Sequence, residues 1–162
     1  MILILLVAGI GFVATREQKL PIVNVDGSII GKYSIKEIMA LNLPYECTFK
    51  KVDSNTEISG TLDTDGQKIR GDFDINITAT ENEKQNLASH LIVSENTAYI
   101  WTSLNTLGYK TPYTNSASTN ASPIEQSQII GLKDKTNLVC RPWNATPNSF
   151  DLPSGITFSE VK

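Results

Sequence analysis

Acidic side chains suited to acid–base chemistry lie close together near the middle of the chain. Asp72 and Asp74 are two positions apart in a predicted strand, so both carboxylates lie on one face, as in hydrolases that use paired acids. They alternate with Lys68 and Arg70, however, and a solvent-exposed ladder of opposite charges explains the same spacing. We interpret the pattern as a charge ladder.

His90 is the only histidine of the chain and lies in a second predicted strand. Catalysis by histidine usually needs a nucleophile and an orienting acid, and the neighbouring Ser89 points to the opposite face of a strand. We therefore expect His90 to be a hydrogen-bonded structural residue. The sequence contains no nucleophile elbow, P-loop or dinucleotide fingerprint, so we expect no enzymatic activity and no cofactor.

Asp63, Asp65 and Gly66 share residue types with a calcium-binding loop, but their spacing is that of a hairpin turn. An EF-hand loop needs glycine at its sixth position and glutamate at its twelfth, whereas here the glycine is fourth and the twelfth residue is Asp74. One histidine and two cysteines cannot build a multi-histidine or cysteine-rich zinc centre. We predict no metal site.

Cys47 and Cys140 are the only thiols of the chain. An even number of cysteines in an exported protein favours a disulfide, and a bridge that closes so long a loop would stabilise the fold. Two buried free thiols are the alternative. The hydrophobic N-terminus, which indicates export, favours the bridge.

Residues 1–15 (MILILLVAGIGFVAT) form an uncharged hydrophobic segment that Arg16, Glu17 and Lys19 follow. As a helix this segment would span about 22 Å, less than the ~30 Å of a bilayer core. The length suits a signal peptide or a membrane anchor, and a buried N-terminal element is the alternative. We predict membrane contact through this segment and a domain on the extracytoplasmic side, or secretion if the segment is cleaved.

The composition is that of a folded domain. The chain has 162 residues, of which 40% are apolar and 19% charged, and its formal net charge is −3. These values exclude a wholly disordered chain, and the missing basic stripe argues against a nucleic-acid partner. We expect one domain at 34–162, preceded by the hydrophobic segment 1–15 and a connector at 16–33.

Hydrophobic periodicity predicts one short helix followed by strands. Ser34 and Glu37 form a capping-box pattern, and Pro44 ends the helical segment. In the clearest strand, 67–78, apolar residues alternate with charged ones, whereas the strand at 97–103 carries bulky residues on both faces. A strand that is apolar on both sides is either sandwiched or lines a cavity.

The remaining elements complete the predicted fold. We expect further strands or short elements at 45–52, 56–63, 87–94, 128–132, 136–141 and 156–161, and a polar loop at 111–123. The fold class is therefore α+β and mostly β. We predict a curved antiparallel sheet, a half-barrel meander, with one short helix, preceded by an N-terminal hydrophobic helix.

Three motifs resemble those of exported proteins. They are Gly60-Thr-Leu62 with Gly66-Gln-Lys-Ile-Arg70-Gly-Asp-Phe73, then Ser89-His90-Leu-Ile-Val93, then Thr97-Ala-Tyr99-Ile-Trp101. The chain is similar to uncharacterised exported, membrane-anchored proteins of reduced-genome bacteria. More distantly, residues 34–104 resemble the LolA-like periplasmic lipoprotein carriers. That resemblance implies an unclosed barrel with a helix on its concave side, where acyl chains bind.

The resemblance also implies a ligand-binding set: Ile69, Phe73, Ile75, Tyr99 and Trp101. Its functional implication is a non-catalytic, membrane-tethered domain that binds a lipid, a lipoprotein acyl chain or another hydrophobic ligand. The alternative is a structural or protein-interaction module of the cell envelope, with a filled core and no ligand. The bulk on both faces of 97–103 favours a lined cavity but also fits a sandwich.

Overall fold

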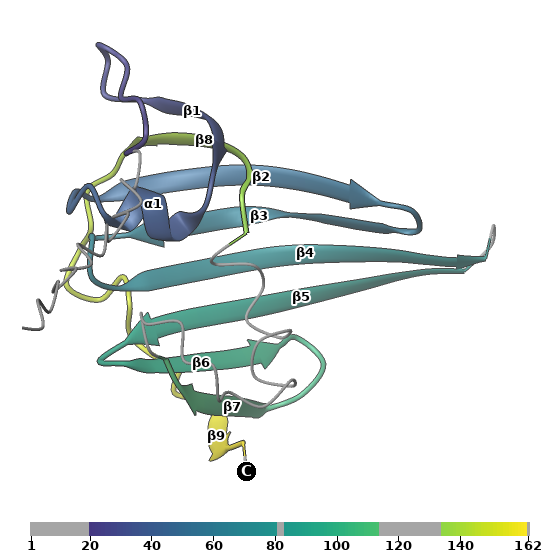
Figure 1. The fold of residues 1–162 in the computed structure, drawn as a ribbon. Helices are drawn as coiled ribbons and strands as arrows, with labels where there is room; N and C mark the ends of the chain where they lie inside the picture. Colours follow the sequence, from purple (N-terminus) through teal and green to yellow (C-terminus); the bar gives the residue numbers. More distant parts are fainter. Residues whose placement is uncertain (1–19, 81–82, 114–133, 162) are drawn as a thin grey trace, which may run out of the picture.

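The computed structural model describes residues 20–80, 83–113 and 134–161. These residues form one open, mixed sheet of nine strands and one short helix, α1 (Ile35–Met39) (Figure 1). The strands are β1 (Ile29–Tyr33), β2 (Tyr45–Asp53), β3 (Thr56–Thr64), β4 (Ile69–Thr80), β5 (Glu83–Ser94), β6 (Thr97–Thr102), β7 (Leu107–Pro112), β8 (Thr136–Pro142) and β9 (Thr157–Glu160). The prediction of a mostly β fold with one short helix is confirmed.

The strand order in the sheet is β1-β8-β2-β3-β4-β5-β6-β7-β9. Strands β2 to β7 follow one another as an antiparallel meander, whereas β8 inserts between β1 and β2. Strand β9 pairs with β7 in parallel at the far edge. The centre of the sheet therefore forms from local contacts, whereas its two ends are completed by the first strand, β1, with β8 and by the last strand, β9.

Left-handed backbone conformations at two hairpin tips explain why the meander turns there. Gly66 has a φ of 95° in the turn after β3, where Asp65 Oδ1 accepts a hydrogen bond from the Gln67 backbone N at 2.8 Å. Glu95 and Asn96 have φ values of 51° and 60° in the turn between β5 and β6. Two consecutive positive φ values are typical of a type I′ hairpin turn. Both hairpins predicted from the sequence are confirmed.

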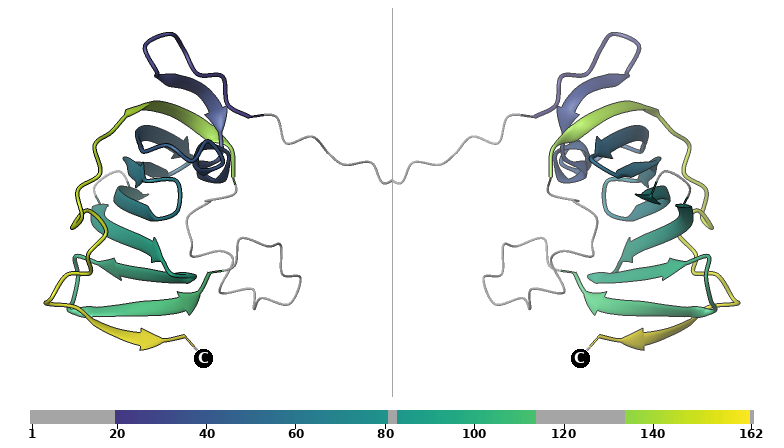
Figure 2. Two further views of the ribbon diagram at one scale, coloured as in Figure 1. Left: turned by 90° about the vertical axis from the view of Figure 1, so that its left-hand side faces the viewer. Right: turned by 90° about the vertical axis from the view of Figure 1, so that its right-hand side faces the viewer.

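Helix α1 begins at the predicted capping box. Ser34 Oγ accepts a hydrogen bond from the Glu37 backbone N at 3.3 Å, and Glu37 Oε2 accepts one from the Ser34 backbone N at 2.9 Å. These bonds satisfy amides that the first turn of a helix leaves unpaired. The buried side chains of Ile35, Ile38 and Met39 join the hydrophobic core. Figure 2 shows α1 on one side of the sheet.

A disulfide joins β8 to β2. Cys47 and Cys140 lie directly opposite each other in the strand register and form the predicted bridge. Both residues are 0% exposed and belong to the core that Ile29 and Ile38 also form. The alternative of two free thiols is thereby excluded.

Strand alternation divides the side chains between two faces of the sheet. The helix face carries α1 and the core, which includes Ile69 and Phe73 of β4. The outer face carries Arg70 and Asp74 of the same strand, both of them exposed. The segment between β8 and β9 crosses the outer face (Figure 2), and its Phe150 is buried there. The alternation predicted for 67–78 is confirmed.

Two strands occur where the sequence predicted none. Strand β1 lies within the stretch assigned to a connector, because its pairing partner β8 comes about 100 residues later in the chain. Strand β7 contains Gly108 and Pro112, two residue types that weaken a strand pattern. The sheet therefore includes part of the predicted connector and the beginning of the predicted polar loop.

The prediction of an antiparallel sheet is wrong at β9. After β8 the chain crosses the outer face and returns beside β7 in the parallel direction, instead of turning back as a hairpin. The predicted N-terminal helix, the element at 128–132 and most of the loop at 111–123 lie outside the described residues.

Candidate functional site

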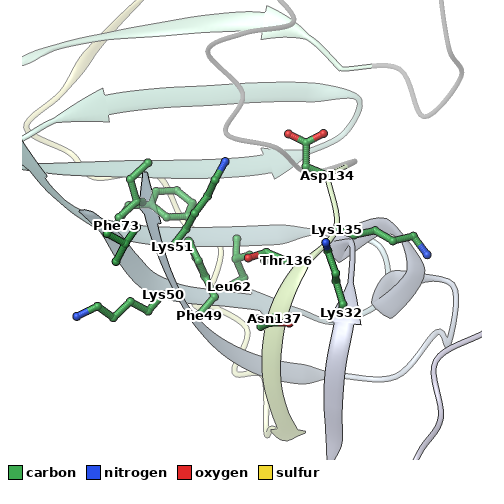
Figure 3. Close-up of a pocket in the computed structure, with 12 residues that line it drawn as sticks. Lys32, Phe49, Lys50, Lys51, Leu62, Phe73, Asp134, Lys135, Thr136 and Asn137 are labelled. Carbon is green, nitrogen blue, oxygen red and sulfur yellow. The ribbon is translucent and has the colours of Figure 1, made fainter. Parts of the chain in front are cut away.

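A pocket of about 400 Å³ opens on the helix face over β2, β3 and β4 (Figure 3). Its volume lies within the range of roughly 300–1,000 Å³ that small-molecule sites occupy. Residues 134–137, at the start of β8, and one residue of β1 form its side wall. The lining consists of Lys32, Phe49, Lys50, Lys51, Val52, Ile58, Leu62, Phe73, Asp134, Lys135, Thr136 and Asn137.

The floor of the pocket is apolar, and we define it as Phe49, Ile58, Leu62 and Phe73. Phe49 and Phe73 meet edge to face with ring centroids 5.9 Å apart, although β3 lies between their strands. Gly60 of β3 stands opposite both rings in the register, and a side chain there would clash with the Asp72 carbonyl oxygen and press against the Phe73 ring. The glycine therefore lets the two rings form one continuous apolar surface.

Lysine side chains form the rim above this floor. Asp134 is the one acid of the lining, and Lys50 Nζ lies 2.9 Å from Glu57 Oε2. The positive rim contrasts with the net charge of −3 of the whole chain. An apolar floor below a cationic rim is an amphipathic surface. The lysines of the lining, which we call the lysine rim, are Lys32, Lys50, Lys51 and Lys135; the Lys50 side chain leaves β2 on the side opposite to Phe49, where it meets Glu57.

The capping box of α1 fixes one lysine of the rim. Lys135 Nζ lies 2.7 Å from Glu37 Oε1. Burial raises the pKa of Glu37, but hydrogen bonds from Lys135 and Ser34 outweigh burial and hold that pKa below its usual value. Glu37 is therefore ionised at neutral pH and neutralises Lys135. By contrast, Lys32 and Lys51 form no ion pair with any residue that the structure describes.

Three of the five ligand-binding residues implied by the resemblance share the helix face. Phe73 lies in the floor of the pocket. Ile69 is 0% exposed and is packed in the core, outside the lining. Ile75 stands opposite Ile58 of the floor in the register but is not itself part of the lining.

The other two residues, Tyr99 and Trp101, lie on the outer face. Their rings meet the ring of Phe158 in β9 edge to face, with centroids 5.3 Å and 5.8 Å apart. The structure therefore does not bring the five residues into one cavity. The bulk on both faces of β6 has a direct cause, because the core covers one face and the Phe158 ring of the edge strand β9 contacts the aromatic rings on the other.

Acidic and aromatic side chains form a row across the outer face. Asp72, His90 and Trp101 stand opposite one another in β4, β5 and β6. His90 Nδ1 lies 2.7 Å from Asp72 Oδ1, and the His90 ring stacks on Trp101 with centroids 5.2 Å apart. Arg70 Nε donates to Asp72 Oδ2 at 2.9 Å. His90 is thus hydrogen-bonded and Asp72 is ion-paired, as the sequence predicted. We call Asp72, His90, Trp101 and Phe158 the outer row.

Asp63 of β3 is a partly buried acid on the same face. Burial, reinforced by the negative charge of Glu46 and opposed by Arg70, raises the pKa of Asp63 to about 6. Its Oδ1 atom is buried and has no hydrogen-bond partner among the described residues. Within the same residues, no three His, Cys, Asp or Glu side chains are arranged to hold a metal ion.

Sequence reasoning missed most of the pocket: Phe49, Ile58, Leu62 and the lysine rim. One signal was present, because Phe49 alternates with Tyr45 and Cys47 and must share their face. The Cys47–Cys140 bridge also requires β8 to lie beside β2, which brings residues 134–137 to the same end of the sheet. Those two inferences together would have located the pocket.

Comparison with known proteins identifies no relative. No family model, no curated protein and no solved structure matches the chain. The resemblance to LolA-like carriers stays a prediction. Among the residues that the structure describes, no helix is long and apolar enough to cross a membrane, and residues 1–15 lie outside that set.

Proposed function

We propose that this domain binds the acyl chain of a lipid or lipoprotein, or a similar hydrophobic ligand, in the pocket of the helix face and performs no catalysis. The observation that carries the proposal is the apolar floor, which a ligand can reach below the lysine rim. Each Å² of apolar surface that leaves water contributes about 25 cal/mol. A hydrocarbon chain that covers the exposed parts of Phe49 and Ile58 gains this energy without any movement of the sheet, whereas Phe73 is only 3% exposed and supports the floor from below.

We further propose that the domain works outside the cytoplasm, tethered through residues 1–15 or secreted after their cleavage. The buried Cys47–Cys140 bridge supports this location, because structural disulfides persist in oxidising compartments. The uncharged residues 1–15 suit an anchor, and a tethered domain would meet acyl chains at the membrane surface.

In this proposal the sheet acts as a half-barrel that α1 fills at one end. Ile35, Ile38 and Met39 occupy the helix face near the disulfide, so the part of that face that no described residue covers remains for a ligand. The alternative is a structural or interaction module of the cell envelope. The well-filled core below α1 suits both roles, and a direct measurement of binding separates them.

The test is a titration with a fluorescent single-chain fatty acid, using the full chain exported to an oxidising compartment. Ile58→Gln places a polar group of similar size in the floor, and the lost apolar contact should weaken binding by about tenfold. The matched control is Ile77→Gln. Ile77 belongs to the neighbouring strand β4, is 38% exposed and lies outside the lining.

The mass and circular dichroism spectrum of each variant confirm that the disulfide and the sheet are intact. Saturable binding that Ile58→Gln weakens and Ile77→Gln leaves unchanged would support the proposal. Absence of binding to the unmodified chain, or equal loss in both variants, would favour the structural module.

A further inference from the structure

We propose that the pocket selects a single-chain amphiphile with an anionic headgroup, and that Lys51 and Lys32 hold this headgroup. This inference rests on the proposed function, because it names the ligand class of the same pocket. It goes further by dividing the pocket into an apolar part for the chain and a cationic part for the headgroup. The ligand class includes fatty acids and other single-chain acids.

The charges around the pocket support this selectivity. Lys50 is paired with Glu57, and Lys135 is paired with Glu37. Intramolecular carboxylates therefore neutralise these two lysines of the rim. The other two have no ion-pair partner among the described residues, so their charge can act on a ligand.

Lys51 and Lys32 line the pocket from two different strands. Figure 3 shows Lys51 entering from β2 and Lys32 entering from β1. Lys51 follows Phe49 by two residues in β2, so its side chain leaves the strand on the same face as that ring. Long lysine side chains cover apolar surface with their methylene groups and keep the ammonium group in water. A carboxylate at the rim would meet these ammonium groups while its chain covers the floor.

The size of the pocket favours one chain over two. Its volume of about 400 Å³ is near the lower end of the range for ligand sites, roughly 300–1,000 Å³. A phospholipid with two acyl chains would leave the second chain in water. Thr136 and Asn137 in the side wall add hydrogen-bonding groups beside the lysines. The side wall is therefore polar where the headgroup would lie.

The test measures how well palmitate, palmityl alcohol and acetate displace the fluorescent fatty acid from the full chain, held in nanodiscs of zwitterionic lipid. Every variant is measured in the same nanodiscs. The fraction of the probe that dissolves in the lipid is therefore the same for all variants and does not affect the ratio of one variant's affinity to another's. We expect the unmodified chain to bind palmitate on the order of fivefold more tightly than the alcohol, with a preference that falls as salt rises. Acetate should not compete.

The decisive variant is the double substitution Lys32→Met with Lys51→Met. It should weaken palmitate binding by about fivefold to tenfold and leave alcohol binding unchanged. Lys84→Met removes the same kind of charge from an exposed site outside the lining and should change neither affinity. Both lysines of the double variant are exposed, so the fold should tolerate their replacement.

Each contrary outcome has a distinct meaning. Equal affinities for palmitate and alcohol, unchanged in the double variant, would overturn the anionic selectivity and leave the proposed function standing. Competition by acetate as strong as that by palmitate would also overturn it, because the site would then be a simple anion site. Absence of displacement by every ligand would overturn both the selectivity and the proposed function.

Discussion

The two faces of the sheet use aromatic residues in different ways. On the outer face, the Trp101 ring contacts His90 in one direction and Phe158 in another, so its neighbours come from the protein itself. On the helix face, Phe49 and Phe73 contact each other and also line an open pocket. The outer cluster holds strands together, whereas on the helix face the buried Phe73 supports Phe49, which presents surface to a ligand.

The difference shows that an aromatic residue in a strand does not reveal its role by its type. Tyr99 and Trp101 look like ligand contacts in the sequence, but the Phe158 ring of β9 packs against both of their rings. Phe49 attracts less attention in the sequence and lies in the floor. What covers each ring decides its role, and late segments of the chain provide that cover.

The largest expected effect comes from removing the disulfide at the helix face. The double variant Cys47→Ala with Cys140→Ala should lose about 3–5 kcal/mol of unfolding free energy, because the bridge closes a long loop and joins β8 to β2. Urea unfolding of the full chain, followed by circular dichroism, measures the loss. Binding should fall as well, because residues 134–137 form a wall of the pocket. A loss below about 1 kcal/mol would show that the bridge is not a main support of this end of the sheet.

An intermediate effect is expected at the outer face from Phe158→Ala. Phe158 is half-buried and contacts both Tyr99 and Trp101, so its removal should cost about 2 kcal/mol of unfolding free energy. Because these rings lie on the opposite face from the pocket, ligand affinity should not change. Urea unfolding and the fatty-acid titration measure the two quantities. If Phe158→Ala lowered the ligand affinity as well as the stability, the claim that only the helix face binds the ligand would be contradicted.

The smallest effect is a pH-dependent stability that Asp63 confers on the outer face. The pKa of Asp63 is raised from 3.8 to about 6 in the folded chain, so the folded state holds this proton more tightly than the unfolded state. Its contribution to stability is complete below the unfolded pKa and is lost as pH rises through the folded pKa. Asp63→Asn should therefore stabilise the chain at neutral pH by about 1 kcal/mol, after allowance for solvent screening of a half-exposed group.

The measurement is the unfolding free energy of both chains across the pH range from about 4 to about 7.5. The gain from Asp63→Asn should appear as pH rises and vanish at the acidic end. Asp74→Asn is the control, because Asp74 is exposed on the same face. A gain that is constant with pH would contradict the assigned ionisation of Asp63.

Local patterns were sufficient to predict the centre of the fold. The capping box at Ser34, the turns at Gly66 and Asn96 and the alternation around Phe73 all depend on neighbouring residues, and each is confirmed. The disulfide could be predicted because the chain has two cysteines. Each of these local features can be recognised from the types and spacing of a few neighbouring residues.

Long-range pairing could not be predicted in the same way. Strand β1 depends on β8, and β9 lies beside β7 only because the preceding segment crosses the outer face. The pocket could not be predicted for the same reason. Its lining residues Lys32, Phe49 and Lys135 come from β1, from β2 and from the segment just before β8, which only long-range strand pairing brings together. Periodicity assigns a residue to a face of its own strand, but the register between distant strands decides its neighbours.

The central claim is that the helix face binds the ligand and the outer face does not. The most direct test compares the fatty-acid affinity of Ile58→Gln with that of Phe158→Ala in the same titration. We predict that Ile58→Gln weakens binding by about tenfold, whereas Phe158→Ala leaves affinity unchanged even though it destabilises the fold. The opposite result, with affinity lost in Phe158→Ala and kept in Ile58→Gln, would contradict the claim and place the ligand at the outer row.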